Sequence, residues 1–92
     1  MEVLVKSVIG IDFDSEDAIV LREFLRDLLN EETRDEVILD FSDIDRVPTT
    51  FFCSLLTDLI NTKGRDYIIN KLGVKNLSNS RDYRRVLLGT AF

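Results

Sequence analysis

The sequence predicts a small single-domain α/β protein, in which the order β-α-β-α-β-α gives a mainly parallel three- to four-stranded sheet with flanking helices. Two observations predict this class. Short apolar segments rich in β-branched residues alternate with segments in which apolar residues recur at helical spacing. Strands that alternate with helices in this way form parallel sheets joined by right-handed crossovers. The chain has 92 residues, slightly below the usual domain size of about 100 to 200, so residues 1–92 are expected to form one domain.

The first strand is expected over residues 3–13, because apolar residues occupy most of the odd positions there. Leu4 and Val8 are apolar on the opposite face, which favours a sheet covered on both sides. Asp14 is suited to cap a following helix of about 16 residues, since a side-chain oxygen there accepts from a free backbone amide. The core-facing residues of that helix are expected to be Ala18, Leu21, Phe24, Leu25, Leu28 and Leu29.

The nearly continuous apolar run at residues 37–41 predicts a central strand buried on both faces. Pro48 disfavours a helical conformation for Val47, and Thr49 or Thr50 is then expected to cap a second helix.

The rest of the chain is expected to continue the same alternation. The sequence predicts a short helical turn at 66–70, a third strand at 72–77, a cap at 78–80 and a last helix. That helix turns Tyr83, Val86 and Leu87 inward and arginines outward.

Composition excludes several classes of site. The chain has no histidine and a single cysteine, Cys53, which removes Ser-His-Asp and Cys-His nucleophiles, most zinc sites and any internal disulfide. The net charge of −5 argues against nucleic-acid binding. No apolar stretch approaches a membrane span and no signal peptide is apparent, so a cytoplasmic protein without a membrane partner is expected.

The net charge is divided unevenly along the chain. Residues 1–46 hold 5 Lys and Arg against 14 Asp and Glu, a net charge of −9, whereas residues 47–92 hold 7 against 3, a net charge of +4. The two halves meet at Val47, directly before the Pro-Thr-Thr sequence.

The run VILDFSDIDRVPTTFF at 37–52 resembles the strand, loop and helix start of STAS domains, the group named for sulfate transporters and anti-sigma-factor antagonists. The run GRDYIINKLGVKNLSNS at 64–80 and the acidic helix opening at Ser15 look more specifically like the STAS-like family DUF4325. In anti-sigma-factor antagonists, a kinase partner phosphorylates a serine in this loop and the complex then dissociates. The resemblance places Thr49 at the phosphoacceptor position and Thr50 after it, with Pro48 in place of the family's aspartate and Phe51 in place of its glycine.

The resemblance implies a non-catalytic regulatory module that binds a protein, with no cofactor and no metal. The expected partner is a histidine-kinase-type ATPase or an anti-sigma-like kinase. The expected contact surface is the loop and helix start, comprising Asp43, Asp45, Arg46, Val47, Pro48 and Phe51 together with the phosphoacceptor candidates Thr49 and Thr50. A three-stranded sheet has two edges close to its centre, so a homodimer through an edge or a helix face is also expected.

Other interpretations remain open at this stage. The simpler interpretation, which the sequence favours, is that Thr49 and Thr50 are the cap and first-turn residues of the helix that follows Val-Pro. Asp40 and its neighbours Asp43 and Asp45 follow a central strand, where a receiver-like phosphoryl acceptor or a Mg²⁺ site would lie, with Asp12 or Asp14 as added acids. A purely structural subunit is the third alternative.

Overall fold

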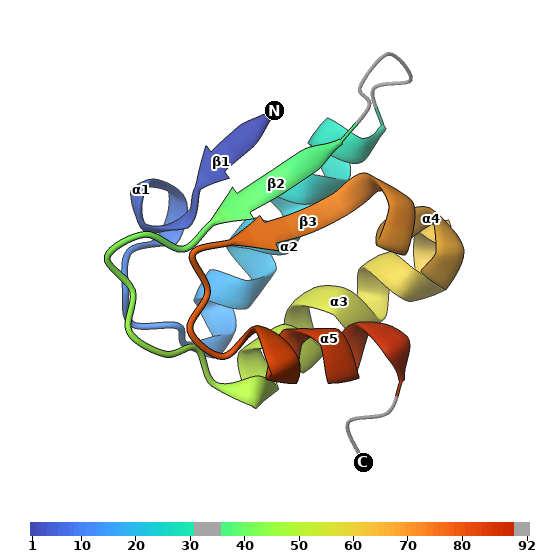
Figure 1. The fold of residues 1–92 in the computed structure, drawn as a ribbon. Helices are drawn as coiled ribbons and strands as arrows, with labels where there is room; N and C mark the ends of the chain where they lie inside the picture. The colour runs from blue at the N-terminus through green and yellow to red at the C-terminus, as the bar shows by residue number, and fades with distance from the viewer. Residues whose placement is uncertain (31–35, 90–92) are drawn as a thin grey trace.

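The computed structural model describes residues 1–30 and 36–89. Three strands, β1 (Glu2–Leu4), β2 (Val37–Asp40) and β3 (Leu72–Lys75), form one parallel sheet in the order β1-β2-β3. The five helices are α1 (Val5–Ile9), α2 (Ser15–Leu29), α3 (Thr49–Lys63), α4 (Arg65–Lys71) and α5 (Ser80–Leu88). The predicted α/β class, the parallel sheet and the central place of β2 are confirmed (Figure 1).

One face of the sheet is covered by helices and the other is open. Right-handed crossovers that step through the strands in the order 1-2-3 place every connecting helix on the same face. In Figure 1 the strands lie in front and α2 passes behind them. The burial of β2 alternates accordingly, because Val37 and Leu39 are fully buried whereas Ile38 and Asp40 are half-buried. The prediction that this strand is buried on both faces was therefore wrong.

The first predicted strand is much shorter than expected. It ends at Leu4, and residues 5–9 turn into helix α1. Val5 is buried and Val8 and Ile9 pack partly against the core, so the apolar residues here satisfy helical spacing as well as alternation. Gly10 then ends the helix with φ 80°, a conformation that glycine adopts at little cost.

Helix α2 begins where the sequence predicts. The Asp14 side chain accepts from the amide of Asp17 at 2.9 Å, and the Asp17 carboxylate accepts from the amide of Asp14 at 3.3 Å, so the two residues cap each other. The expectation for Phe24 was wrong, because its side chain remains 37% exposed on the flank of the helix.

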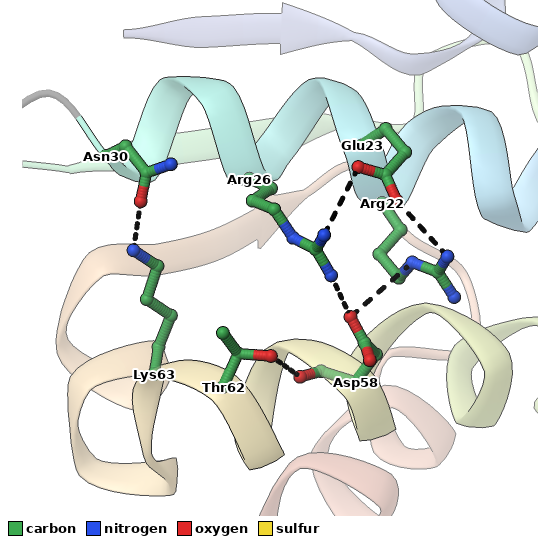
Figure 2. A network of polar contacts seen from close by, with 7 residues as sticks. All are labelled: Arg22, Glu23, Arg26, Asn30, Asp58, Thr62 and Lys63. Carbon is green, nitrogen blue, oxygen red and sulfur yellow. Dashed lines mark hydrogen bonds and ion pairs between the residues drawn. The ribbon is translucent and has the colours of Figure 1, made fainter.

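Charged residues tie α2 to α3 on their solvent side (Figure 2). Asp58 of α3 forms an ion pair with Arg26 and lies 3.7 Å from Nε of Arg22. Glu23 pairs with both arginines, at 3.2 and 3.5 Å, and Lys63 donates to the side chain of Asn30. This network links the solvent sides of α2 and α3, which pack against each other.

The core contains one buried hydroxyl without a partner. Tyr83 of α5 stacks edge-on against Phe52 at 5.5 Å, and its hydroxyl makes no hydrogen bond to the described residues. Burial raises the pKa of Tyr83, because the phenolate would be poorly solvated.

We therefore expect Tyr83→Phe to raise the free energy of unfolding by about 1 kcal/mol at neutral pH. The unfolded Tyr83 ionises near pH 10 while the folded one stays protonated, so the wild type should lose additional stability, roughly 1 kcal/mol per pH unit, above pH 10. Urea titrations of both proteins at pH 7 and in steps above pH 10 measure this. Equal stability at pH 7 and a constant difference above pH 10 would contradict it.

Candidate functional site

The predicted site lies where β2 and β3 end, at the edge of the sheet from which two loops emerge. The loop at 41–48 connects β2 to α3, and the loop at 76–79 connects β3 to α5. Because the two strands are parallel neighbours, their loops leave the sheet side by side (Figure 1). Several polar contacts join these loops to each other and to the neighbouring helices.

The first contact is made by Asp40, the last residue of β2. Its Oδ1 accepts three hydrogen bonds, from the amide of Ser42 at 3.0 Å, the hydroxyl of Ser42 at 2.6 Å and the side-chain amide of Asn76 at 2.9 Å. These bonds, with Lys75 nearby, hold the pKa of Asp40 below its usual value, since each favours the carboxylate. Asn76 itself has φ 57°, a left-handed conformation that asparagine tolerates better than most residues.

The second contact is a clamp made by Asn79, the only buried polar residue among those described. Its side-chain amide donates to the carbonyl of Val47 at 2.7 Å, and its oxygen accepts from the amide of Val47 at 3.2 Å. A single side chain thus satisfies both backbone groups of a buried residue, as a neighbouring strand would. This clamp holds the chain directly before the Pro-Thr-Thr sequence.

Further contacts hold the rest of the loop. The hydroxyl of Ser78 donates to the carbonyl of Asp45, and Arg46 pairs with Asp82 of α5 at 3.2 Å. On the other side, Lys6 of α1 pairs with Asp43 at 2.8 Å. The loop is therefore anchored from both α1 and α5.

The predicted contact residues divide into exposed and buried ones. Asp43, Asp45, Arg46 and the three residues at 48–50 are exposed. Val47 and Phe51 are buried in the core, so their side chains hold the loop in place and do not lie on its outer surface.

Thr49 and Thr50 do not cap α3. Pro48 occupies the cap position and makes no side-chain hydrogen bond, and Thr49 and Thr50 are the first two residues of the helix. The expectation that a threonine caps this helix was therefore wrong, whereas the expected place of a threonine in its first turn is confirmed. Both hydroxyls are left on an exposed ridge, formed by residues 48–50, at the positive end of the helix dipole.

A cavity of about 370 Å³ lies beside this ridge, between the starts of α2 and α3. Phe13 and Phe51, stacked edge-on at 4.9 Å, form one side of it. The other residues that line it are Asp14, Ser15, Ala18, Thr50 and Ser54. Thr50 thus faces a cavity with several hydroxyl groups.

The receiver-like arrangement gains little support from these positions. Asp14 caps α2 and Asp40 is tied to Ser42 and Asn76. Within residues 1–30 and 36–89, no three acidic, histidine or cysteine residues are grouped closely enough to hold a metal ion. The same described residues include no helix long and apolar enough to cross a membrane.

Sequence reasoning missed the residues that fix the loop, namely Lys6, Asn76, Ser78 and Asn79. The available signal was the polar run Asn-Leu-Ser-Asn-Ser at 76–80, which was interpreted as a strand end and a cap. Their contacts join residues more than 30 positions apart, and no local spacing predicts such pairs.

The low pKa of Asp40 predicts a defined pH dependence. The ionised form of Asp40 is favoured in the folded state, because its pKa there is lower than in the unfolded chain. Its contribution to stability is therefore fully present above about pH 4, the pKa of an unperturbed aspartate, and is lost as the pH falls through the lower pKa of the folded state. Asp40→Asn should therefore show a shallower loss of stability between pH 5 and 2 than the wild type. Thermal unfolding across that pH range measures both slopes. Parallel curves for Asp40→Asn and the wild type would contradict the prediction.

Comparison with known proteins agrees with the fold. The family model described as a STAS-like domain of unknown function, DUF4325, matches residues 17–82, which run from the first turn of α2 to the first turn of α5. Neither the curated proteins nor the solved structures contain a significant match. The match includes β2, the loop, α3 and β3, and the three-stranded parallel sheet with its helices is consistent with a STAS-like fold. The chain therefore belongs to the DUF4325 family of STAS-like domains.

Proposed function

We propose that this domain is a non-catalytic regulatory module that binds a protein partner through the ridge at 48–50 and the adjacent exposed loop residues Asp43, Asp45 and Arg46. The observation that carries the proposal is the contrast at the start of α3. Pro48, Thr49 and Thr50 are exposed, while Val47 before them is buried and clamped by Asn79 and Phe51 after them is buried. A surface held this firmly needs little ordering when a partner binds, so less affinity is lost to entropy.

The geometry also favours a phosphorylation switch at this ridge. A phosphate on Thr49 or Thr50 would lie at the start of α3, where free amides and the helix dipole stabilise negative charge. The fold therefore tolerates the modification. The partner-facing surface would gain about −1.5 to −2 charges next to the loop acids Asp43 and Asp45, which opposes a contact formed in the unmodified state.

The kind of partner follows from family resemblance. A histidine-kinase-type ATPase or an anti-sigma-like kinase would both bind the unmodified ridge and phosphorylate it. The pairing of Arg46 with Asp82 and of Lys6 with Asp43 leaves Asp45 as the loop acid without an ion pair among the described residues. Asp45 is thus the loop acid whose carboxylate is available to accept hydrogen bonds from neutral donors of the partner.

The test is phosphorylation by a histidine-kinase-type ATPase or anti-sigma-like kinase of the same organism. Incubation with that protein and ATP should add one phosphate, and fragmentation should place it on Thr49 or Thr50 as an acid-stable phosphothreonine. The double variant Thr49→Val, Thr50→Val should take up none, while Thr57→Val, an exposed control on the same helix, should be modified normally. A base-labile acyl phosphate on an aspartate would favour the receiver-like function instead. An unmodified chain in the presence of an active kinase would refute the switch.

A further inference from the structure

The outward side of α2 is unusual for a surface helix. Surface helices normally present polar side chains to solvent, yet Ile19 and Val20 are 49% and 51% exposed and Phe24 is 37% exposed. Three acids share this side of the helix. We call the set the α2 outer face: Glu16, Ile19, Val20, Glu23, Phe24 and Asp27.

Among the described residues, the acids of the α2 outer face are only partly neutralised. Glu23 pairs with Arg22 and Arg26, as Figure 2 shows. Glu16 and Asp27 make no ion pair with any described residue. The face therefore combines exposed apolar area with uncompensated negative charge, which suits a partner surface that is basic and partly apolar.

Helix α5 has a surface of that kind. Arg81, Arg84 and Leu88 follow one another at spacings of three and four residues, so they lie along one exposed stripe of the helix, and Leu88 is 48% exposed. Arg81 and Arg84 form no ion pair with the described residues. Arg81 also lies in the first turn of α5, where the helix dipole disfavours a cation. We call these three residues the α5 stripe. Its positive charge complements the negative charge of the α2 outer face.

We propose that two copies of this chain associate about a two-fold axis, so that the α2 outer face of each copy packs on the α5 stripe of the other. Both α2 and α5 pack against α3 within one copy. A two-fold contact is reciprocal, so the α2–α5 contact occurs twice and the pair is closed. Direct α2–α2 pairing is disfavoured, because it would place Glu16 and Asp27 opposite acids of the same kind.

Sedimentation of the purified protein at low (~0.05 M) and high (~0.5 M) salt tests this contact. The wild type should sediment as a dimer at low salt, and its dissociation constant should rise at least about 10-fold at high salt because the charge pairs are screened. The variant Glu16→Lys, Asp27→Lys should be monomeric, as should Arg81→Glu, Arg84→Glu. Mixing these two variants should restore a dimer, because each then complements the other. Asp66→Lys, which changes the net charge on α4, should leave the dimer intact.

The outcomes separate this contact from other modes of association. A wild type that remains monomeric at about 1 mM in low salt, where even weak specific contacts form, would overturn the proposal. A dimer that both charge-reversed variants retain would also overturn it, because another surface would then be responsible. If both variants are folded by circular dichroism and their mixture stays monomeric, the α2–α5 pairing is wrong. None of these results depends on a kinase, so the proposed regulatory function is tested separately.

Discussion

Asn79→Ala is expected to lower the free energy of unfolding by about 3 kcal/mol, a large fraction of the stability of a domain of this size. The substitution leaves the amide and carbonyl of Val47 without partners in a position that solvent does not reach. Each unsatisfied buried group costs about 1 to 3 kcal/mol, and the side-chain bond from Asn79 to Asp82 at 3.1 Å is lost as well. Urea denaturation at neutral pH measures the change.

A matched control distinguishes the clamp from the loss of any asparagine. Asn61 is exposed on α3, and Asn61→Ala should change stability by less than about 0.5 kcal/mol. If Asn79→Ala unfolds at the same urea concentration as Asn61→Ala, the clamp does not hold the loop. Exchange of the Val47 amide gives a second readout, because it should become fast in Asn79→Ala while amides of β2 remain protected.

Thr49→Asp, Thr50→Asp is expected to weaken binding to the partner ATPase or kinase by about 100-fold, which corresponds to about 2.7 kcal/mol. The substitution places negative charge on the ridge that the proposed function assigns to the contact. Charge in a desolvated protein contact is costly unless the partner neutralises it. Titration calorimetry with the unmodified partner measures the change.

Stability provides the internal control for this prediction. Acids in the first turn of a helix interact favourably with its dipole, so the double variant should be as stable as the wild type or more stable by up to about 1 kcal/mol. Thr57→Asp adds a charge two turns further along α3, away from the ridge, and should bind with wild-type affinity. Equal loss of affinity in Thr57→Asp and the ridge variant would show that net charge, and not the position of the ridge, governs binding.

The sequence was most informative where the physical determinants are local. The cap at Asp14 and the central strand at Val37 depend on residues close in the chain, and both are present in the structure. The threonine caps failed because Pro48 takes the cap position and places both threonines inside the helix. A hydroxyl residue that follows proline can lie either at the cap or in the first turn of a helix, and the sequence does not distinguish these two positions.

Other errors came from ambiguous spacing and from topology. Val5 and Ile9 fit alternation as well as a helical turn, so the first strand was predicted too long. The open face of the sheet follows from strand order and crossover handedness, which no single segment encodes. Across that face, Lys75 of β3 forms an ion pair with Glu2 of β1 and lies 4.0 Å from the carboxylate of Asp40 of β2.

The loop and helix start stand out in the sequence as one segment, but the contacts that hold them do not. Residues 43–51 were identified in advance, but Asn79 lies 32 positions from the residue that it clamps. Such a contact depends on two parallel strands being neighbours, which is known only once the sheet order is known.

The central claim is that a protein partner binds the ridge at 48–50 and the exposed loop beside it. Mapping amide chemical shifts of the labelled domain during titration with the partner ATPase or kinase tests this claim most directly. We expect the largest shifts at residues 43–50, with smaller ones at 78–82, where Asn79 and Asp82 support the loop. Shifts confined to the α2 outer face or to the open face of the sheet, with residues 43–50 unchanged, would contradict it.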